Sequence, residues 1–347
     1  MIISINILLR VIISLMVMLI AFSIYLAYKR IVEGFHSKQK ESYMNATEDK
    51  WYRYFRGEIE FAPEFIPKNK HEIAGVEEIF LAYLKNVSNE EIQEEIKRFA
   101  NQYLKLHYQK LLTHRRWSVR MNALYRIIDF QMTSLSHECV KLEERRLSKE
   151  ESFQLLKIYS LLQPERLLNK ILKLSATFSE YEFKKLLISV DIRTLQKLMK
   201  RMEELPLSCQ YSIIDLLGVK RDAEYLPFLE SRLEHENAEI RIRALKAIVQ
   251  IGYIEKMNKY LPFASSPIWE ERLMVAKLLG NLPFSDTFPI LQKLLQDESW
   301  WVRSQAAKTI GGGKDGKIRL QSFIETATDP YAIDAAYEVL EKGRHIE

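Results

Sequence analysis

The strongest constraint on the fold is a segment that recurs in the second half of the chain at a fixed interval. Each of its three clearest copies carries an arginine at the fourth position and a lysine five positions later. The arginines are Arg241, Arg272 and Arg303, and the differences 272 − 241 and 303 − 272 both equal 31. The copies are Ala238–Val249, Trp269–Gly280 and Trp300–Gly311. A period in the range of about 20 to 50 residues predicts a protein built from stacked repeats.

Weaker copies extend the pattern toward the N-terminus. Leu207–Gly218 has Gln210 at the arginine position, and the difference 241 − 210 is again 31. A distant copy begins at Trp117 and contains Arg120, for which the difference 241 − 120 is 121, close to four steps. Degenerate units are therefore expected between residues 132 and 206, which gives about eight units in all.

Within one copy the spacing of the apolar residues predicts an α-helix. Small or aliphatic residues stand three, four, seven and eight positions after the arginine, and these positions share one helical face. The last of them is Gly280 or Gly311, and glycine inside a helix costs about 1 kcal/mol, so we expect a neighbouring helix to approach closely there. A second apolar segment precedes each turn, with Pro227 or Pro289 expected near its start. Each unit is thus predicted to be a helical hairpin.

These features resemble the HEAT repeat: a proline near the start of the first helix, Asn237 or Asp297 at the turn, and Val-Arg or Ile-Arg opening the second helix. The resemblance covers about residues 222–311 and 104–131, is weak over 150–206, and fails in the last unit, where Asp334 replaces arginine (303 + 31). It implies an α-solenoid whose arginines bond turn residues of an adjacent unit. This structural ladder consists of Arg120, Arg241, Arg272 and Arg303.

The N-terminal segment, residues 1–30, differs from the rest of the chain. Val11–Tyr28 is an uninterrupted uncharged segment, close to the length of about 20 residues that spans a bilayer as a helix. A cleaved signal peptide is the alternative, but the positive charges follow the segment and no Ala-x-Ala site is present. Residues 1–30 are therefore predicted to be a transmembrane anchor. The charge excess on the C-terminal side (Lys29, Arg30, Lys38, Lys40) predicts a single-pass protein of the cell membrane with its N-terminus outside and the repeats in the cytoplasm.

The remaining sequence divides into two regions. Residues 31–71 are predicted to be a juxtamembrane linker followed by an N-terminal cap, and 72–347 a single HEAT-like array. In Trp51–Gly57, aromatic residues alternate with arginines, which suits either a cap over the first hairpin or a segment at the lipid headgroups. With 47% hydrophobic residues, 11 glycines and 10 prolines in 347 residues, and no strand-like alternation, the fold class is all-α.

Three patterns are candidates for sites of chemistry. Gly311–Lys317 fits G-x-x-x-x-G-K, but Ile318 follows where a P-loop needs Ser or Thr, so a helix end and turn are expected. HEAT-like deoxyhypusine hydroxylases bind iron through His-Glu pairs, but the steps between the pairs here, 137 − 71 and 235 − 137, equal 66 and 98 and are out of register with 31. Those pairs start at His71, His137 and His235.

The third pattern pairs tryptophans with arginines, as in HEAT-like DNA glycosylases, but no carboxylate stands in a recognisable catalytic setting. Cys139 and Cys209 occur in apolar helical contexts and are interpreted as core residues. No catalytic, cofactor-binding or metal-binding residue is therefore predicted, and no cofactor or small-molecule substrate is expected. A net charge of +5 is too small to argue for nucleic acid as a partner.

The lysines of the repeat are the predicted partner-binding residues. Lys246, Lys277 and Lys308 keep the same step of 31 and point away from the buried stripe, toward the concave face that second helices usually line in such arrays. They could bind an acidic protein segment or anionic headgroups. The chain is thus predicted to be a membrane-anchored, non-catalytic scaffold or adaptor for a protein partner. The alternatives are a repeat-based lyase or metal-dependent hydroxylase, and a nucleic-acid-binding HEAT-like protein.

Overall fold

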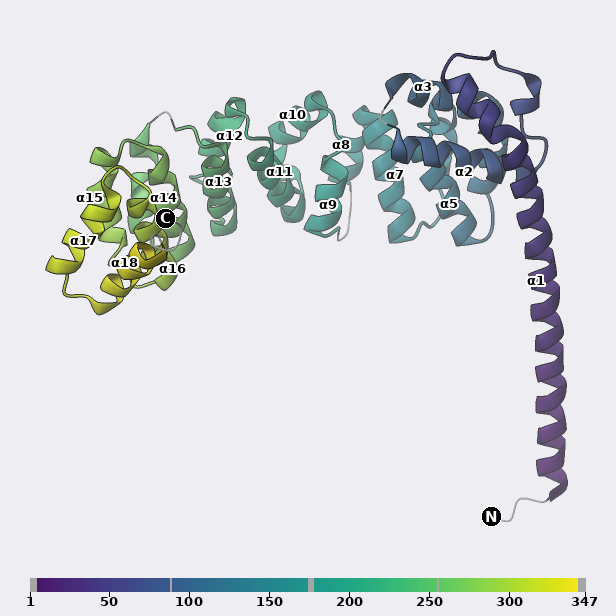
Figure 1. Cartoon of the computed structure of the whole chain (residues 1–347), viewed down its shortest axis with the longest axis horizontal. Helices are drawn as coiled ribbons and strands as arrows, with labels where there is room; N and C mark the ends of the chain where they lie inside the picture. The colour runs from purple at the N-terminus through teal and green to yellow at the C-terminus, as the bar shows by residue number, and fades with distance from the viewer. Residues whose placement is uncertain (1–4, 88, 174–177, 255, 343–347) are drawn as a thin grey trace. The chain divides into compact units, whose positions relative to one another are not determined.

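A computed structural model of the chain describes residues 5–87, 89–173, 178–254 and 256–342, and every regular element in these ranges is helical (Figure 1). The chain forms two compact units, residues 1–163 and 164–347. Their boundary divides the region that the sequence predicts to be a single array, so each unit is described by itself. The boundary falls at Pro164, which starts a new helix as N-terminal prolines often do.

The α-helices of the first unit are α1 (Ile5–Phe55), α2 (Lys70–Asn86), α3 (Glu90–Phe99), α4 (Lys105–Leu112), α5 (Trp117–Asp129), α6 (Ser136–Leu142) and α7 (Lys149–Leu162). A π-helical segment, Ala100–Leu104, joins α3 to α4. The α-helices of the second unit are α8 (Pro164–Leu172), α9 (Glu180–Leu187), α10 (Ile192–Lys200), α11 (Leu207–Lys220), α12 (Leu226–Ser231), α13 (Ala238–Ile251), α14 (Trp269–Leu278), α15 (Phe284–Leu294), α16 (Trp300–Gly311), α17 (Gly316–Thr326) and α18 (Pro330–Lys342).

Helix α1 continues through the region expected to be a linker. It runs without interruption from the apolar N-terminal segment to Phe55 and packs against α2. The contact face includes Tyr43, Thr47 and Trp51, which are spaced four positions apart and therefore share one side of the helix. Gly75 of α2 permits the close approach, since a Cβ there would lie 2.8 Å from the ring of Tyr43. The sequence gives little sign of this packing, because two of the three residues carry a hydroxyl group, so the buried face of the helix does not stand out as apolar.

The apolar part of α1 is exposed in the structure. Among the described helices, α1 is long and apolar enough to cross a membrane, with a mean hydropathy of 2.4 over its most apolar 18-residue window and none of that window buried. A signal sequence near the N-terminus has the same properties. The membrane anchor therefore stays a prediction after the structure is known.

In the second unit, the second helices of successive hairpins pack side by side in chain order. The contacts run from α9 to α11, then to α13, α14, α16 and α18. Glycine at the end of the buried stripe allows this packing: a Cβ on Gly218 would lie 2.9 Å from the Cα of Ala247, and one on Gly311 would lie 2.6 Å from Val339. At Gly280, where the sequence also predicts a close approach, a Cβ would meet only the side chain of Thr309, at 3.2 Å. One expectation is corrected: Pro289 lies inside α15 rather than near its start, because that helix already begins at Phe284.

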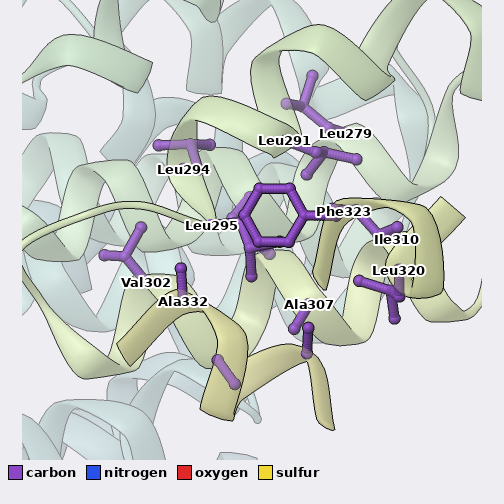
Figure 2. Close-up of a cluster of buried hydrophobic side chains, with 14 of the residues drawn as sticks. Leu279, Leu291, Leu294, Leu295, Val302, Ala307, Ile310, Leu320, Phe323 and Ala332 are labelled. Atoms are coloured by element: carbon purple, nitrogen blue, oxygen red, sulfur yellow. The ribbon is translucent and has the colours of Figure 1, made fainter. Parts of the chain in front are cut away.

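The core of the last hairpins shows how the stripe is used. Val275, Ala276, Ala306 and Ala307 are buried between neighbouring second helices. Figure 2 shows Phe323 of α17 reaching into a cluster of leucines contributed by α15 and its neighbours. Small residues on the second helices and large ones on the first therefore fill the same interior.

Candidate functional site: two columns of basic residues

The arginines of the repeat (the arginine column: Arg120, Arg241, Arg272 and Arg303) share one set of bonds to their own turns. In each case Nη1 donates to the carbonyl oxygen six positions earlier, over 2.7–3.0 Å. All except Arg272 also donate to the carbonyl five positions earlier. In the eroded copy, the amide of Gln210 donates to the carbonyl of Leu205, which is again five positions earlier. The side chain thus holds the turn against the start of the second helix.

Three of these arginines also bind a carboxylate of the following unit. The Nε of Arg120 donates to Glu151 and the Nε of Arg241 donates to Glu271, each over 2.7 Å. Arg272 uses both Nε and Nη2 on the two oxygens of Asp297, at 2.6 and 2.9 Å. The resemblance implied bonds to an adjacent unit, and the structure shows two kinds of bond. In these three residues Nη1 binds the arginine's own turn, while Nε binds the next unit.

These ion pairs are enclosed, which shifts their proton equilibria. Burial alone would raise the pKa of Glu151, but the hydrogen bonds from Arg120 and Ser148 outweigh it and the pKa lies below its ordinary value. The hydrogen bond to Asp297 is the main cause that raises the pKa of Arg272. Both groups stay charged at neutral pH, so the arginine column holds the hairpins in register.

Arg303 is the exception in the arginine column. It is only 8% exposed, and its Nε has no hydrogen-bond partner among the described residues. Thr328 stands where Arg272 has Asp297 (297 − 272 and 328 − 303 are both 25). The guanidinium instead lies 5.3 Å from the ring centre of Tyr331. Arg303 is therefore the one arginine of the column that binds no carboxylate of a following unit among the described residues.

The lysines of the repeat (the lysine column: Lys246, Lys277 and Lys308) lie on α13, α14 and α16, at the same register of three helices that pack consecutively. Lys246 and Lys308 are exposed and Lys277 is half-buried. No ion pair involves any of the three among the described residues, whereas every arginine of the column is bonded. The two columns thus differ in whether their charges are bonded among the described residues.

The register of the lysine column, though not its run of unpaired lysines, continues toward the N-terminus. Two more steps of 31 lead to Asp215 on α11 and Lys184 on α9 (246 − 215 and 215 − 184). Asp215 accepts from the Nζ of Lys184 at 2.6 Å and from Arg243 at 2.9 Å, so its charge is compensated within the unit. The same arithmetic that found the repeat would have found both residues.

A shallow pocket of about 240 Å³ lies beside this end of the column. Two of its wall residues, Ile188 and Val219, are among the most exposed aliphatic side chains of the unit, at 75% and 70%. Its lining is Lys184, Ile188, Asp215, Leu216, Val219, Lys246 and Gln250. An apolar surface edged by lysines suits a segment that carries both aliphatic and acidic side chains.

The structure separates the histidines that are candidate metal ligands. His71 stacks on His36 of α1 with ring centres 4.2 Å apart, and burial is the main cause that lowers its pKa. His235 lies in the turn before α13, where its Nδ1 accepts from the N–H of Asn237 at 2.9 Å. His137 belongs to α6. Among the described residues, no group of three or more His, Cys, Asp or Glu side chains could hold a metal ion.

The other two patterns occupy structural positions in the described chain. Gly311–Lys317 forms the end of α16, a turn and the start of α17, with a helix and not a strand before it. Trp117 donates to Ser148 at 3.0 Å, and the ring of Trp301 stacks on that of Trp269.

Both cysteines are core residues, as the sequence indicates. The thiols of Cys139 and Cys209 are free and enclosed, and burial raises the pKa of each to about 12. Neither thiol is therefore a reactive thiolate at neutral pH.

Comparison with known proteins bears on the C-terminal repeats. The family model for HEAT repeats matches residues 257–341, which include α14 to α17 and all but the last residue of α18. None of the curated proteins matches the chain. Two crystal structures of engineered proteins from the Northeast Structural Genomics Consortium are similar to it. The first is 17% identical, covers 78% of this chain and 79% of the engineered chain, and has a TM-score of 0.32. The second is 16% identical, covers 71% of this chain and 95% of the engineered chain, and has a TM-score of 0.26. The prediction of a HEAT-like helical repeat protein is confirmed for the matched segment.

Proposed function

We propose that this chain, whose residues 257–341 match HEAT repeats, is a non-catalytic scaffold that binds an acidic segment of a protein partner through the lysine column. The observation that supports this most is the contrast between the two basic columns. The arginines are enclosed and bonded, while Lys246, Lys277 and Lys308 make no ion pair among the described residues. One lysine on each of three consecutive second helices forms a regular row of positive charges, which suits a partner with regularly placed carboxylates.

The proposal places the scaffold at a membrane through α1 and its array in the cytoplasm. The exposed apolar segment of α1 supports the anchor, and the four basic residues that follow it support the orientation. Labelling can test the orientation, because the two native cysteines are buried and give little background. A cysteine introduced at exposed Lys220 is expected to react with an impermeant maleimide only after the membrane is permeabilised. Reaction in intact cells would reverse the assignment.

Crosslinking in membranes followed by mass spectrometry tests the partner-binding role. The variant Lys246→Glu/Lys277→Glu/Lys308→Glu reverses the column and is expected to lose the partners that the unmodified protein captures. A matched control is Lys197→Glu/Lys200→Glu/Lys293→Glu, which changes the net charge equally but lies on α10 and α15, among the first helices. The same partner list for both variants would contradict the proposal.

A further inference from the structure

The first unit contains a small pocket whose walls are mainly aromatic. Its volume is about 190 Å³, enough for one small ligand group. It lies where the end of α1, the loop that follows it, α3 and the π-helical segment meet. The lining consists of Trp51, Tyr54, Phe61, Glu95, Arg98, Phe99, Gln102 and Tyr103.

The rings are set at different angles around this pocket. Trp51 and Phe99 are buried at its base, 1% and 5% exposed, and meet edge to face at 5.1 Å. Phe61 is 36% exposed; it lies at 69° to Tyr54 and almost parallel to Tyr103, with centres 6.0 and 5.6 Å away. Rings so arranged offer π-faces from more than one direction, which is how proteins enclose organic cations.

One carboxylate belongs to the wall of this pocket. Glu95 accepts from the hydroxyl of Tyr54 at 2.7 Å, and its other oxygen lies 3.0 Å from Arg98. Burial, followed by Glu95 itself, raises the pKa of Tyr54 to about 12, so this hydroxyl remains a donor at neutral pH. The side chain of Arg98 is 70% exposed, which makes its pairing with Glu95 weak and displaceable. A negative charge among aromatic rings is therefore available to an incoming cation.

Two further features support a binding role. Gln102 and Tyr103 reach the pocket from the π-helical segment Ala100–Leu104, and π-helical turns occur frequently at functional sites. A larger hollow of about 650 Å³ shares Tyr54, Glu95 and Arg98 with the pocket. Its lining adds three more carboxylates, those of Glu90, Glu91 and Glu94, of which Glu94 pairs with Lys97, and one more arginine, Arg56. The carboxylates of the hollow outnumber its arginines, and an excess of negative charge favours cations over anions.

We propose that this aromatic pocket binds a soluble organic cation, specifically the methylated ammonium head of a small molecule. The rings supply cation–π contact and Glu95 supplies the counter-charge. With α1 anchored as proposed above, a lipid headgroup lies too far away, because the distance from Tyr28 to Trp51 along the continuous helix α1 is about 35 Å. The site does not depend on the lysine column, which belongs to the other unit.

The test is a ligand-observed NMR titration of the full chain in maltoside micelles, which contain no choline group. Choline is expected to bind with a Kd on the order of 1 mM, and its uncharged isostere 3,3-dimethylbutan-1-ol about tenfold more weakly. Equal binding of the two compounds, or no saturable choline binding up to about 50 mM, would overturn the proposal.

Variants of two pocket residues test the location of the site, because they should change the affinity for choline in opposite directions. Glu95→Gln keeps an acceptor for Tyr54 but removes the charge, and we expect roughly fivefold weaker choline binding. Arg98→Gln frees Glu95 from its competitor and is expected to tighten binding. Glu150→Gln, on the exposed surface of α7 and outside both hollows, is the matched control and should change the Kd by less than about twofold.

Lipid discs can distinguish a soluble cation from a choline headgroup of the membrane lipid. Choline affinity is expected to be the same in phosphatidylcholine and phosphatidylglycerol discs, because no lipid headgroup reaches the pocket. Weaker choline binding in the phosphatidylcholine discs would mean that the lipid competes, and would refute a soluble ligand. A Glu95→Gln variant that binds choline as well as the unmodified protein does would refute the site itself.

Discussion

Arg272 and Arg303 allow the carboxylate ladder to be tested within one chain. The two residues hold the same register of adjacent second helices, and both donate from Nη1 to the carbonyl six positions earlier. They differ in that Arg272 also binds Asp297 through two bonds, whereas the Nε of Arg303 has no partner among the described residues. Replacement of each by Met keeps much of the aliphatic stem and removes the charge. The enclosed carboxylate pair is the main difference between the two variants; the smaller ones are the Glu298 side-chain contact of Arg272 and the second carbonyl bond and Tyr331 contact of Arg303.

The structure gives the expected difference between the two variants. Arg272 and Asp297 have side chains that are each 8% exposed, and removal of one partner of an enclosed ion pair costs about 3–5 kcal/mol. Arg303→Met removes the bonds from a charged donor to two carbonyl oxygens and the contact with the ring of Tyr331, and we expect a cost of about 2 kcal/mol. Arg272→Met should therefore open its hairpin about thirtyfold more readily than Arg303→Met, which corresponds to about 2 kcal/mol.

Hydrogen exchange followed by mass spectrometry is the appropriate assay, because repeat arrays open unit by unit and a single free energy of unfolding does not describe them. The readout is the protection of the amides of α14 and α16. Asp297→Asn added to Arg272→Met removes the orphaned charge and keeps an acceptor for the N–H of Ser299, so it should recover part of the loss. If Arg303→Met costs as much as Arg272→Met, or if the double variant recovers nothing, the reasoning fails.

Three further outcomes are expected. Gly218→Ala should destabilise the α11–α13 contact by about 1–3 kcal/mol, because the new Cβ would meet a backbone atom. Gly34→Ala in α1 is the control: its Cβ would have no neighbour within 4 Å, so the change should be neutral or stabilising. The rate of proteolysis of each variant measures the effect. Thr328→Asp offers Arg303 the carboxylate that it lacks and should slow exchange in α16 by about tenfold; unchanged exchange would contradict this assignment of Thr328 as the missing carboxylate position. The lowered pKa of His71 means that the unfolded chain binds its proton first as the pH falls, so stability should decrease as the pH falls through about 6.5 toward the folded-state pKa. His71→Gln should flatten this part of a pH series of thermal unfolding, and an unchanged slope would exclude His71 as the cause.

The sequence predicts the repeats well wherever the step of 31 is preserved. The segment Trp300–Gly311 is helix α16 without a change of boundary, and Ala238–Val249 is only slightly extended, to Ile251, in α13. This succeeds because each unit buries the same stripe against a copy of itself, so the requirement recurs in the sequence. Between 132 and 206 the helices are present without the signature, because no residue of the arginine column stands there to mark the turns.

The features that the sequence did not predict depend on partners far apart in the chain. Phe61 and Tyr103 stack across the aromatic pocket although they are distant in the sequence and belong to different elements. The stripe of α1 that packs on α2 includes Thr47, which looks like a solvent-facing residue until its neighbour is known. The spacing of apolar residues shows which face of a helix is buried, but it does not identify a contact that one residue makes with a distant segment.

The two columns of basic residues show why a constant step within one chain does not by itself identify a binding surface. Arg241, Arg272 and Arg303 keep the same step of 31 as the lysine column, and each of these three units places its arginine and its lysine on one second helix. The arginine lies beside a turn that offers carbonyl groups, so its charge is used inside the fold. Five positions later the helix has rotated by about 500°, or about 140° beyond a full turn, and a lysine at that position faces away from the turn. The same repeat therefore produces a column of arginines that are bonded within the fold and a column of lysines without an ion pair among the described residues, and our proposal assigns partner binding to the lysines.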